Sequence, residues 1–290
     1  MRITETAIPG LLIIDLDVHG DNRGWFKENW QREKFTGLAP ELASFQPVQN
    51  NISFNHAGAT RGLHAEPWDK LVSVAQGKIF GAWCDLREGS ESFGEVVTHE
   101  VGPETAVFVP RGVANGFQAL EETSYCYLVN EHWSAEARYA AVNLNIVDWP
   151  LEPTEISEKD KQHPDLAEVS PMPARRILVT GANGQLGRAL KRLLADAEFC
   201  SHADFDITNP PERNWKQYSA IINCAAYNDV NGAENDRAAA WAVNAEAPAR
   251  LARIAAENQL TLVHVSSDYI FDGTNEVHTE EELPSPLSAY

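Results

Sequence analysis

A glycine-rich turn in the middle of the chain contains the first residues that could do chemistry. Gly181, Gly184 and Gly187 directly follow a short apolar run at 177–180. Glycines at such positions let the backbone turn sharply, approach a pyrophosphate and pack the next helix against the strand. The helix N-terminus then offers unpaired N–H groups to the anion. A purely structural turn can also use three glycines, but the context favours a dinucleotide site made by Gly181, Asn183, Gly184, Gln185 and Leu186.

The segments around this turn alternate between strand and helix patterns. Strands are expected at 177–180, 220–224 and 261–266, and helices at 185–194 and 237–259. In the last of these, alanine, leucine and isoleucine recur three and four residues apart. Strand–helix–strand alternation predicts a partial α/β Rossmann-like doubly wound parallel sheet over residues 176–290.

Residues 1–165 have short alternating runs, aromatic residues and turn signals. Strands are expected at 11–18, 70–75, 78–85, 106–109 and 125–129. Many short strands with few helical stretches predict an all-β sandwich or barrel. Residues 166–175, which end a proline-rich polar stretch, are expected to link the two domains.

The first domain also contains motifs that follow one another in a recognisable order. They are DNRGWFKE at 21–28, RGLH at 61–64, DKLV at 69–72, DLR at 85–87, VPRG at 109–112 and ISEKD at 156–160. Together they resemble dTDP-4-dehydrorhamnose 3,5-epimerase, an all-β jelly roll of the cupin class. The resemblance implies that this domain epimerises dTDP-4-dehydro-6-deoxyglucose, that it needs no cofactor or metal, and that it forms a homodimer through the barrel.

Epimerisation beside a ketone needs a base, a group that holds the enolate, and an acid on the opposite face. By the resemblance, His64 is the base, Asp160 its orienting carboxylate, Lys70 the enolate stabiliser and Tyr127 the acid, although Tyr125 could compete. The resemblance places the substrate on Arg23, Glu28, Gln49, Asn50 and Arg61, with the two arginines at the diphosphate.

Three positions depart from the family pattern. Asn115 stands where the family has histidine, His132–Trp133 where it has paired tyrosines, and Ala65–Glu66 where it commonly has Tyr/Phe–Gln. These changes affect details of binding, while His64, Asp160 and Lys70 are retained.

The second domain carries NCAAY at 223–227, VNA at 243–245 and HVSSDYIFDG at 264–273. These segments resemble dTDP-4-dehydrorhamnose reductase of the extended short-chain dehydrogenase/reductase superfamily. The resemblance implies that Ser267 holds the carbonyl oxygen and that Tyr290 donates the proton. It adds Asp206, Ile207, Ala225, Ala226 and Tyr227 to the cofactor site. The family's lysine four residues beyond the tyrosine, and its C-terminal lobe, are absent from these 290 residues, so the reductase half is expected to be inactive as written.

The cofactor expected for this half is NADP, with NAD as the alternative. An acidic residue at the end of the second strand would favour NAD by binding the ribose 2′-hydroxyl. Ser201, His202 and Ala203 occupy the corresponding positions.

Composition limits the possible partners and compartments. The formal net charge of −19 argues against binding nucleic acid. No apolar run approaches the roughly 20 residues of a membrane span, and the N-terminus lacks a signal-like apolar core. Four widely spaced cysteines suit a reducing compartment, so a cytoplasmic protein is expected.

Two other functions stay open. A metal-dependent cupin would need a His-x-His pair with a later Glu and His, but Glu66 stands two residues after His64 and Asn115 stands in place of the later histidine. The other alternative is a non-catalytic nucleotide-sugar binding or regulatory module.

Overall fold

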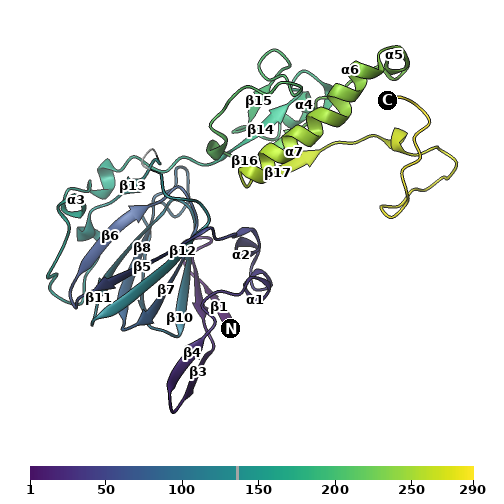
Figure 1. Ribbon diagram of the computed structural model, residues 1–290. Coiled ribbons are helices and arrows are strands. Elements are labelled where there is room, and N and C mark those ends of the chain that lie inside the picture. Colours follow the sequence, from purple (N-terminus) through teal and green to yellow (C-terminus); the bar gives the residue numbers. More distant parts are fainter. Residues whose placement is uncertain (135–136) are drawn as a thin grey trace. The chain divides into compact units, whose positions relative to one another are not determined.

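The computed structural model describes residues 1–134 and 137–290, which divide into two compact units, Met1–Ala174 and Arg175–Tyr290 (Figure 1). Each unit has an apolar core of its own. No helix in the described part of the chain is long and apolar enough to cross a membrane.

The first unit consists of two antiparallel sheets. In spatial order, one contains β1 (Arg2–Glu5), β2 (Leu12–Asp15), β10 (Thr105–Val109), β7 (Lys70–Gln76), β12 (Thr123–Val129) and β5 (Gln49–Asn55). The other contains β13 (Ala140–Ala141), β6 (Thr60–Ala65), β11 (Val113–Ala119), β8 (Ile79–Asp85) and β9 (Val96–Val101). Both sheets contribute to one buried cluster, Val72 and Val107 from the first and Trp83 and Phe117 from the second. Sheets that bury their facing sides in this way form a sandwich, which confirms the predicted jelly roll.

Shorter elements surround these sheets. They are the hairpin of β3 (Val18–Asp21) and β4 (Gly24–Lys27), the helices α1 (Arg32–Thr36), α2 (Pro40–Ser44) and α3 (Glu158–Lys161), and 3-10 turns at Leu144–Ile146 and Leu166–Glu168. The single strand expected at 11–18 is therefore two strands. Strand β2 pairs with β1 and β10, whereas β3 leaves that sheet and pairs with β4.

The segment expected as a linker, 166–175, is largely packed on the first unit. Val169 and Met172 are buried in a cluster with Leu86 and Ala114. The N–H of Met172 donates to the Leu86 carbonyl over 2.7 Å, and the Met172 carbonyl accepts from the Glu88 N–H over 2.8 Å. Its prolines mark an irregular backbone, but buried apolar side chains fix most of this segment against the barrel.

The second unit contains one parallel sheet in the order β15 (Glu198–Cys200), β14 (Arg176–Thr180), β16 (Tyr218–Asn223) and β17 (Thr261–His264). Its helices are α4 (Gln185–Leu190), α5 (Val230–Asn235), α6 (Arg237–Trp241) and α7 (Ala247–Glu257), and a 3-10 turn spans Asp268–Ile270. The predicted Rossmann-like sheet is confirmed. Its strand order reverses between β14 and β16, and ligands of such sheets bind in the crevice beyond the carboxyl ends at that point.

The long helix expected at 237–259 is interrupted near its middle. A π-helical turn, Ala242–Glu246, separates α6 from α7, and the N–H of Ala247 donates to the carbonyl of Ala242. Pro248, in the first turn of α7, has no N–H with which to continue a regular ladder. The helix expected at 185–194 is also shorter, because α4 ends at Leu190.

Candidate active site

A histidine–aspartate pair joins two segments of the first unit that lie far apart in the sequence. His64 is on β6 and Asp160 is in α3, whose first turn is capped by the Ser157 hydroxyl accepting the Asp160 N–H. The His64 Nε2 lies 2.8 Å from Asp160 Oδ1, and the Gly62 N–H donates to Asp160 Oδ2 over 3.1 Å. Gly62 has φ +114, and a Cβ there would lie 2.5 Å from Gly116 Cα. Only glycine allows this close approach of backbones.

The surroundings of Asp160 fix which nitrogen of His64 is free. Burial of this carboxyl opposes ionisation, but hydrogen bonding and charge from His64, with the Gly62 amide, outweigh burial and lower the pKa of Asp160. The ionised carboxylate can only accept, so Nε2 of His64 carries the proton. In the neutral imidazole the other nitrogen, Nδ1, is then unprotonated and can act as a base.

Lys70 and Tyr127 lie at the same cavity. Lys70 begins β7 and is only 6% exposed. Its Nζ is 2.6 Å from Glu66 Oε2 and 4.6 Å from the ring centroid of Tyr127. Burial, followed by the charge of Glu66, raises the pKa of Tyr127. The competing Tyr125 is buried, and its hydroxyl accepts from the Asn115 Nδ2 over 3.1 Å.

A cavity of about 480 Å³ brings these groups together. Its lining includes His64, Asp160, Lys70, Tyr127, Arg61 and Asn51. The Arg61 Nε donates to Asn55 Oδ1 over 2.7 Å, which orients the guanidinium at the cavity wall. The cavity thus brings an imidazole, an ammonium, a phenol and a guanidinium into one site.

Four expected substrate residues lie outside this cavity in the single chain. Arg23 is on the exposed β3–β4 turn and pairs with Asp21, and Glu28 pairs with Lys34. The Gln49 side chain bonds Asn51 and the Trp133 N–H instead. Asn50 points to the outer side of β5, because side chains alternate along a strand and Asn51 and Ser53 face the cavity.

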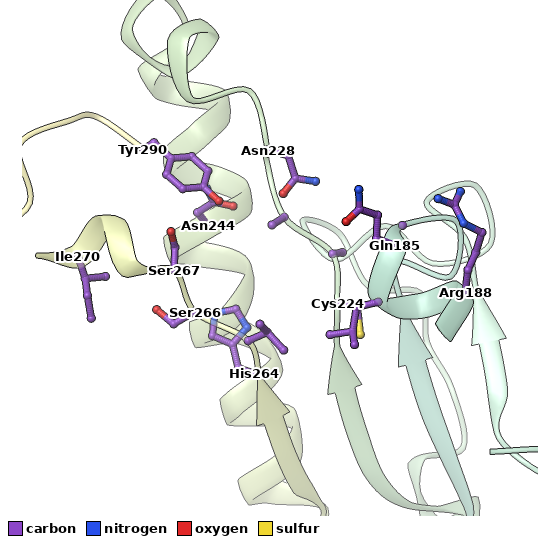
Figure 2. A pocket seen from close by; sticks show the side chains of 15 residues that line it. Gln185, Arg188, Cys224, Asn228, Asn244, His264, Ser266, Ser267, Ile270 and Tyr290 are labelled. Carbon is purple, nitrogen blue, oxygen red and sulfur yellow. The ribbon is translucent and has the colours of Figure 1, made fainter. Parts of the chain in front are cut away.

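The second unit has its own cavity, about 620 Å³, at the carboxyl ends of β14, β16 and β17 (Figure 2). Residues of the glycine turn and of the loop after β16 line it: Gly184, Gln185, Leu186, Ala225 and Ala226. Gly181 has φ +70, and a Cβ there would lie 2.6 Å from the Ala225 N. Gly181 thus allows the two loops to approach closely, although it is not itself among the lining residues.

Ser267 and Tyr290 line this second cavity together. Both lie on one side of it, across from Gln185 and Arg188 (Figure 2). The Ser267 Oγ accepts the Tyr269 N–H over 3.2 Å, so the hydroxyl also caps a turn. The Tyr290 ring packs edge-on against Tyr269, with centroids 5.4 Å apart.

Several expected cofactor residues do not reach the second cavity. Ile207 is buried in the core of this unit, and Asp206 Oδ1 accepts from the N–H and hydroxyl of Thr208. Asn183 and Tyr227 are not among the lining residues. The Asn244 side chain accepts from the Tyr227 N–H and donates to the Tyr227 carbonyl. Asn244 therefore fixes the backbone of the loop that contains Tyr227.

Comparison with known proteins gives a family match for each unit. Residues 5–168 match the profile of the family described as dTDP-4-dehydrorhamnose 3,5-epimerase. The chain belongs to the dTDP-4-dehydrorhamnose 3,5-epimerase family. Residues 175–290 match a second family, described as the RmlD substrate binding domain. The chain therefore combines an epimerase-family unit with a reductase-related segment.

Individual relatives agree with this division. The chain is 52% identical to the protein RmlC homolog of Streptococcus pyogenes over 176 residues, 57% of this chain and 89% of that protein. The structure of RmlC from Streptococcus suis in complex with dTDP-D-xylose is similar with a TM-score of 0.56 and 48% identity, covering 59% of this chain and 94% of that one. The dTDP-4-dehydrorhamnose reductase of Mycobacterium tuberculosis is 45% identical over 106 residues, 34% of this chain. Here the chain spans only 35% of the relative's length.

Sequence reasoning missed some residues of both sites. In the epimerase unit, Asn51 and Ser53 line the cavity while Ile52 and Phe54 are exposed, which is the reverse of what apolar/polar alternation along β5 predicts. In the second unit, His264 lines the cavity, and its Nδ1 lies 3.0 Å from Asn223 Nδ2. No sequence pattern predicts this contact, because it joins residues on two different strands, β16 and β17.

Proposed function

We propose that the first unit catalyses 3,5-epimerisation of dTDP-4-dehydro-6-deoxyglucose. His64 removes the proton at C3 or C5 through Nδ1, while Asp160 stabilises the imidazolium that forms. Lys70 stabilises the enolate oxygen at C4, and Tyr127 returns a proton on the opposite face. The observation that carries the proposal is the 2.8 Å pair of His64 and Asp160 at a cavity that also contains Lys70 and Tyr127.

Deuterium exchange tests this proposal. In deuterated water the wild-type protein should exchange the C3 and C5 hydrogens of the keto sugar, and chelators should not change the rate. His64→Asn should abolish exchange. His56→Asn, at an exposed histidine of the same unit, is the matched control and should exchange normally. Exchange by His64→Asn at the wild-type rate would show that the base is another group. A chelator-sensitive rate would instead favour a metal-dependent cupin.

We also propose that the epimerase unit works as a homodimer and that Arg23 serves the site of a second copy. Arg23 is a substrate residue by family resemblance, yet it lies outside the cavity of its own chain. On the outer face of the edge strand β5, beside Asn50, two apolar side chains are exposed, Ile52 by 69% and Phe54 by 56%. Such a face suits burial against an identical surface.

Subunit complementation tests the homodimer. Arg23→Ala and His64→Asn should each be impaired alone, and co-expression should restore activity, because hybrid dimers contain one site with both residues intact. Additive residual activity in a mixture that sediments as a dimer would place Arg23 elsewhere. A wild-type chain that sediments as a monomer would contradict the homodimer itself.

For the second unit we propose binding of NADP(H), or less tightly NAD(H), without reduction by a polypeptide of these 290 residues. The glycine turn and residues 225–226 line a cavity of suitable place and size. Among the described residues that line this cavity are Ser267 and Tyr290, but no lysine is there to support proton donation by the tyrosine.

The test supplies the epimerised ketone with NADPH and follows the absorbance of the reduced cofactor. No oxidation is expected, while titration should still show binding. Steady substrate-dependent oxidation would contradict the proposal.

A further inference from the structure

Glu66 is a carboxylate inside the epimerase cavity to which the mechanism above gives no role. Its side chain is only 16% exposed, and its Oε2 accepts from two donors: Lys70 Nζ at 2.6 Å and the Trp68 Nε1–H at 3.1 Å. Trp68 is itself buried at 4% exposure and packs edge-on against Tyr139. Glu66 is therefore a fixed group, held by a rigid neighbour.

Lys70 is held from two sides as a result. Glu66 binds its ammonium on one side, and the Tyr127 ring lies 4.6 Å away on another. A lysine side chain has four rotatable bonds and would otherwise sample many positions. Glu66 accepts one of the three N–H groups of the ammonium, so the others are available to the Tyr127 ring and to a ligand in the cavity.

We propose that Glu66 is a positioning residue for the epimerase: its carboxylate orients the Lys70 ammonium so that one N–H points at the C4 oxygen of the sugar. The inference rests on the proposed epimerisation. Glu66 takes no proton from the substrate and forms no bond to it. It acts through Lys70, at the moment when negative charge develops on the enolate oxygen. A preoriented cation costs no reorganisation at that step.

Glu66 also affects Tyr127, the proposed acid of the reaction. Burial, and after it the charge of Glu66, raises the pKa of Tyr127, whereas the charge of Arg61 lowers it. In the described part of the chain, Lys70, Tyr125 and Tyr139 also lie close to this phenol, and His64, Lys159 and Asp160 line the same cavity. A carboxylate at position 66 thus keeps Tyr127 protonated to higher pH than an amide would. Commonly the family has glutamine at this position.

Three variants test whether Glu66 positions Lys70 or only fills space. Glu66→Ala removes the anchor, and kcat for C5 exchange should fall by roughly 10- to 100-fold, the scale of a misplaced catalytic group, with KM changing little. Glu66→Gln retains an oxygen acceptor of the same shape and should lose less. It should also move the alkaline limb of the pH–rate profile to lower pH, because the charge that raises the Tyr127 pKa is gone. Trp68→Phe, which frees the carboxylate, should lower kcat in the same direction as Glu66→Ala.

The controls make each outcome decisive. Glu100→Gln breaks an exposed carboxylate–lysine pair of the same unit, with Lys78 at 3.3 Å, and should leave kcat and the pH profile unchanged. Thermal melting identifies any variant that fails to fold, and Glu66→Gln, being isosteric, then decides the question. Wild-type kcat and an unshifted alkaline limb in folded Glu66→Gln, with wild-type kcat in Trp68→Phe, would overturn the inference. Absence of exchange in the wild-type protein would instead refute the proposed function.

Discussion

Replacing Asp160 with asparagine should inactivate the epimerase because it moves the proton of His64 from one ring nitrogen to the other. Two N–H groups hydrogen-bond to the Asp160 carboxylate, the His64 Nε2–H at 2.8 Å and the Gly62 N–H at 3.1 Å, while His163 Nε2 lies farther off, 3.7 Å from Oδ1. An asparagine has a single oxygen to accept with. The Gly62 donor belongs to the backbone and cannot change, so the asparagine oxygen turns to Gly62 and its NH₂ faces His64.

His64 must then accept through Nε2, which moves its proton to Nδ1, the nitrogen that should take the substrate proton. An Asp→Asn exchange behind a catalytic histidine costs about 10⁴-fold in kcat when it imposes the wrong tautomer. We expect a loss of kcat for C3 and C5 exchange on the order of 10³- to 10⁴-fold, with KM little changed. The assay is deuterium incorporation followed by NMR, together with nitrogen chemical shifts of ¹⁵N-labelled histidine to identify the tautomer.

Glu158→Gln is the matched control, because Glu158 lies in the same helix with its side chain 81% exposed. It should exchange at the wild-type rate and keep the wild-type tautomer. If Asp160→Asn exchanged within about threefold of wild type, or if His64 retained its proton on Nε2, the reasoning about the pair would be refuted.

Three further predictions follow from other contacts. Hydrogen bonds from Arg87, Ser92 and Ser90 outweigh burial and lower the pKa of Asp85 to about 2, from 3.8. They contribute about 2 kcal/mol to the unfolding free energy above pH 4, and this is lost as pH falls toward 2, so the melting temperature of wild type should fall more steeply across that window than that of Asp85→Asn. Gly181→Ala puts a Cβ 2.6 Å from a backbone nitrogen, whereas Gly273→Ala, at a similar φ of +73, meets nothing within 4 Å. In urea unfolding, Gly273→Ala should lower the unfolding free energy by about 1–2 kcal/mol. Gly181→Ala should lower it by more and should also lose NADPH binding. Arg61→Ala should weaken nucleotide-sugar binding by roughly 1.5–3 kcal/mol in calorimetry, and an unchanged Kd would place the diphosphate elsewhere.

The sequence predicted the two fold classes well because each has a characteristic periodicity. Short alternating runs and strand–helix alternation are local patterns, and the structure confirms the jelly roll and the partial Rossmann-like sheet. Local patterns could not show where strands break or helices bend. The division of the strand at 11–18 depends on which partners β2 and β3 find, and the π-helical turn lies just before Pro248 in the first turn of α7.

The sites were less predictable because side-chain direction depends on register. A shift of one residue along β5 separates the outward Asn50 from the cavity-lining Asn51. Ile207 matched a family segment but belongs to the core. Glu66 and Lys70 stand four residues apart in the sequence, yet their pairing follows from the turn between β6 and β7 and not from a helix. Only tertiary structure shows that contact.

One measurement tests the central claim most directly. The 290-residue protein is incubated with dTDP-4-dehydro-6-deoxyglucose in deuterated water, and NMR records deuterium content and configuration at C3 and C5. The account predicts deuterium and inversion at both carbons for wild type, and neither for His64→Asn. A folded wild-type protein that binds the nucleotide sugar but incorporates no deuterium at either carbon would contradict it, and would identify the unit as a non-catalytic binding module.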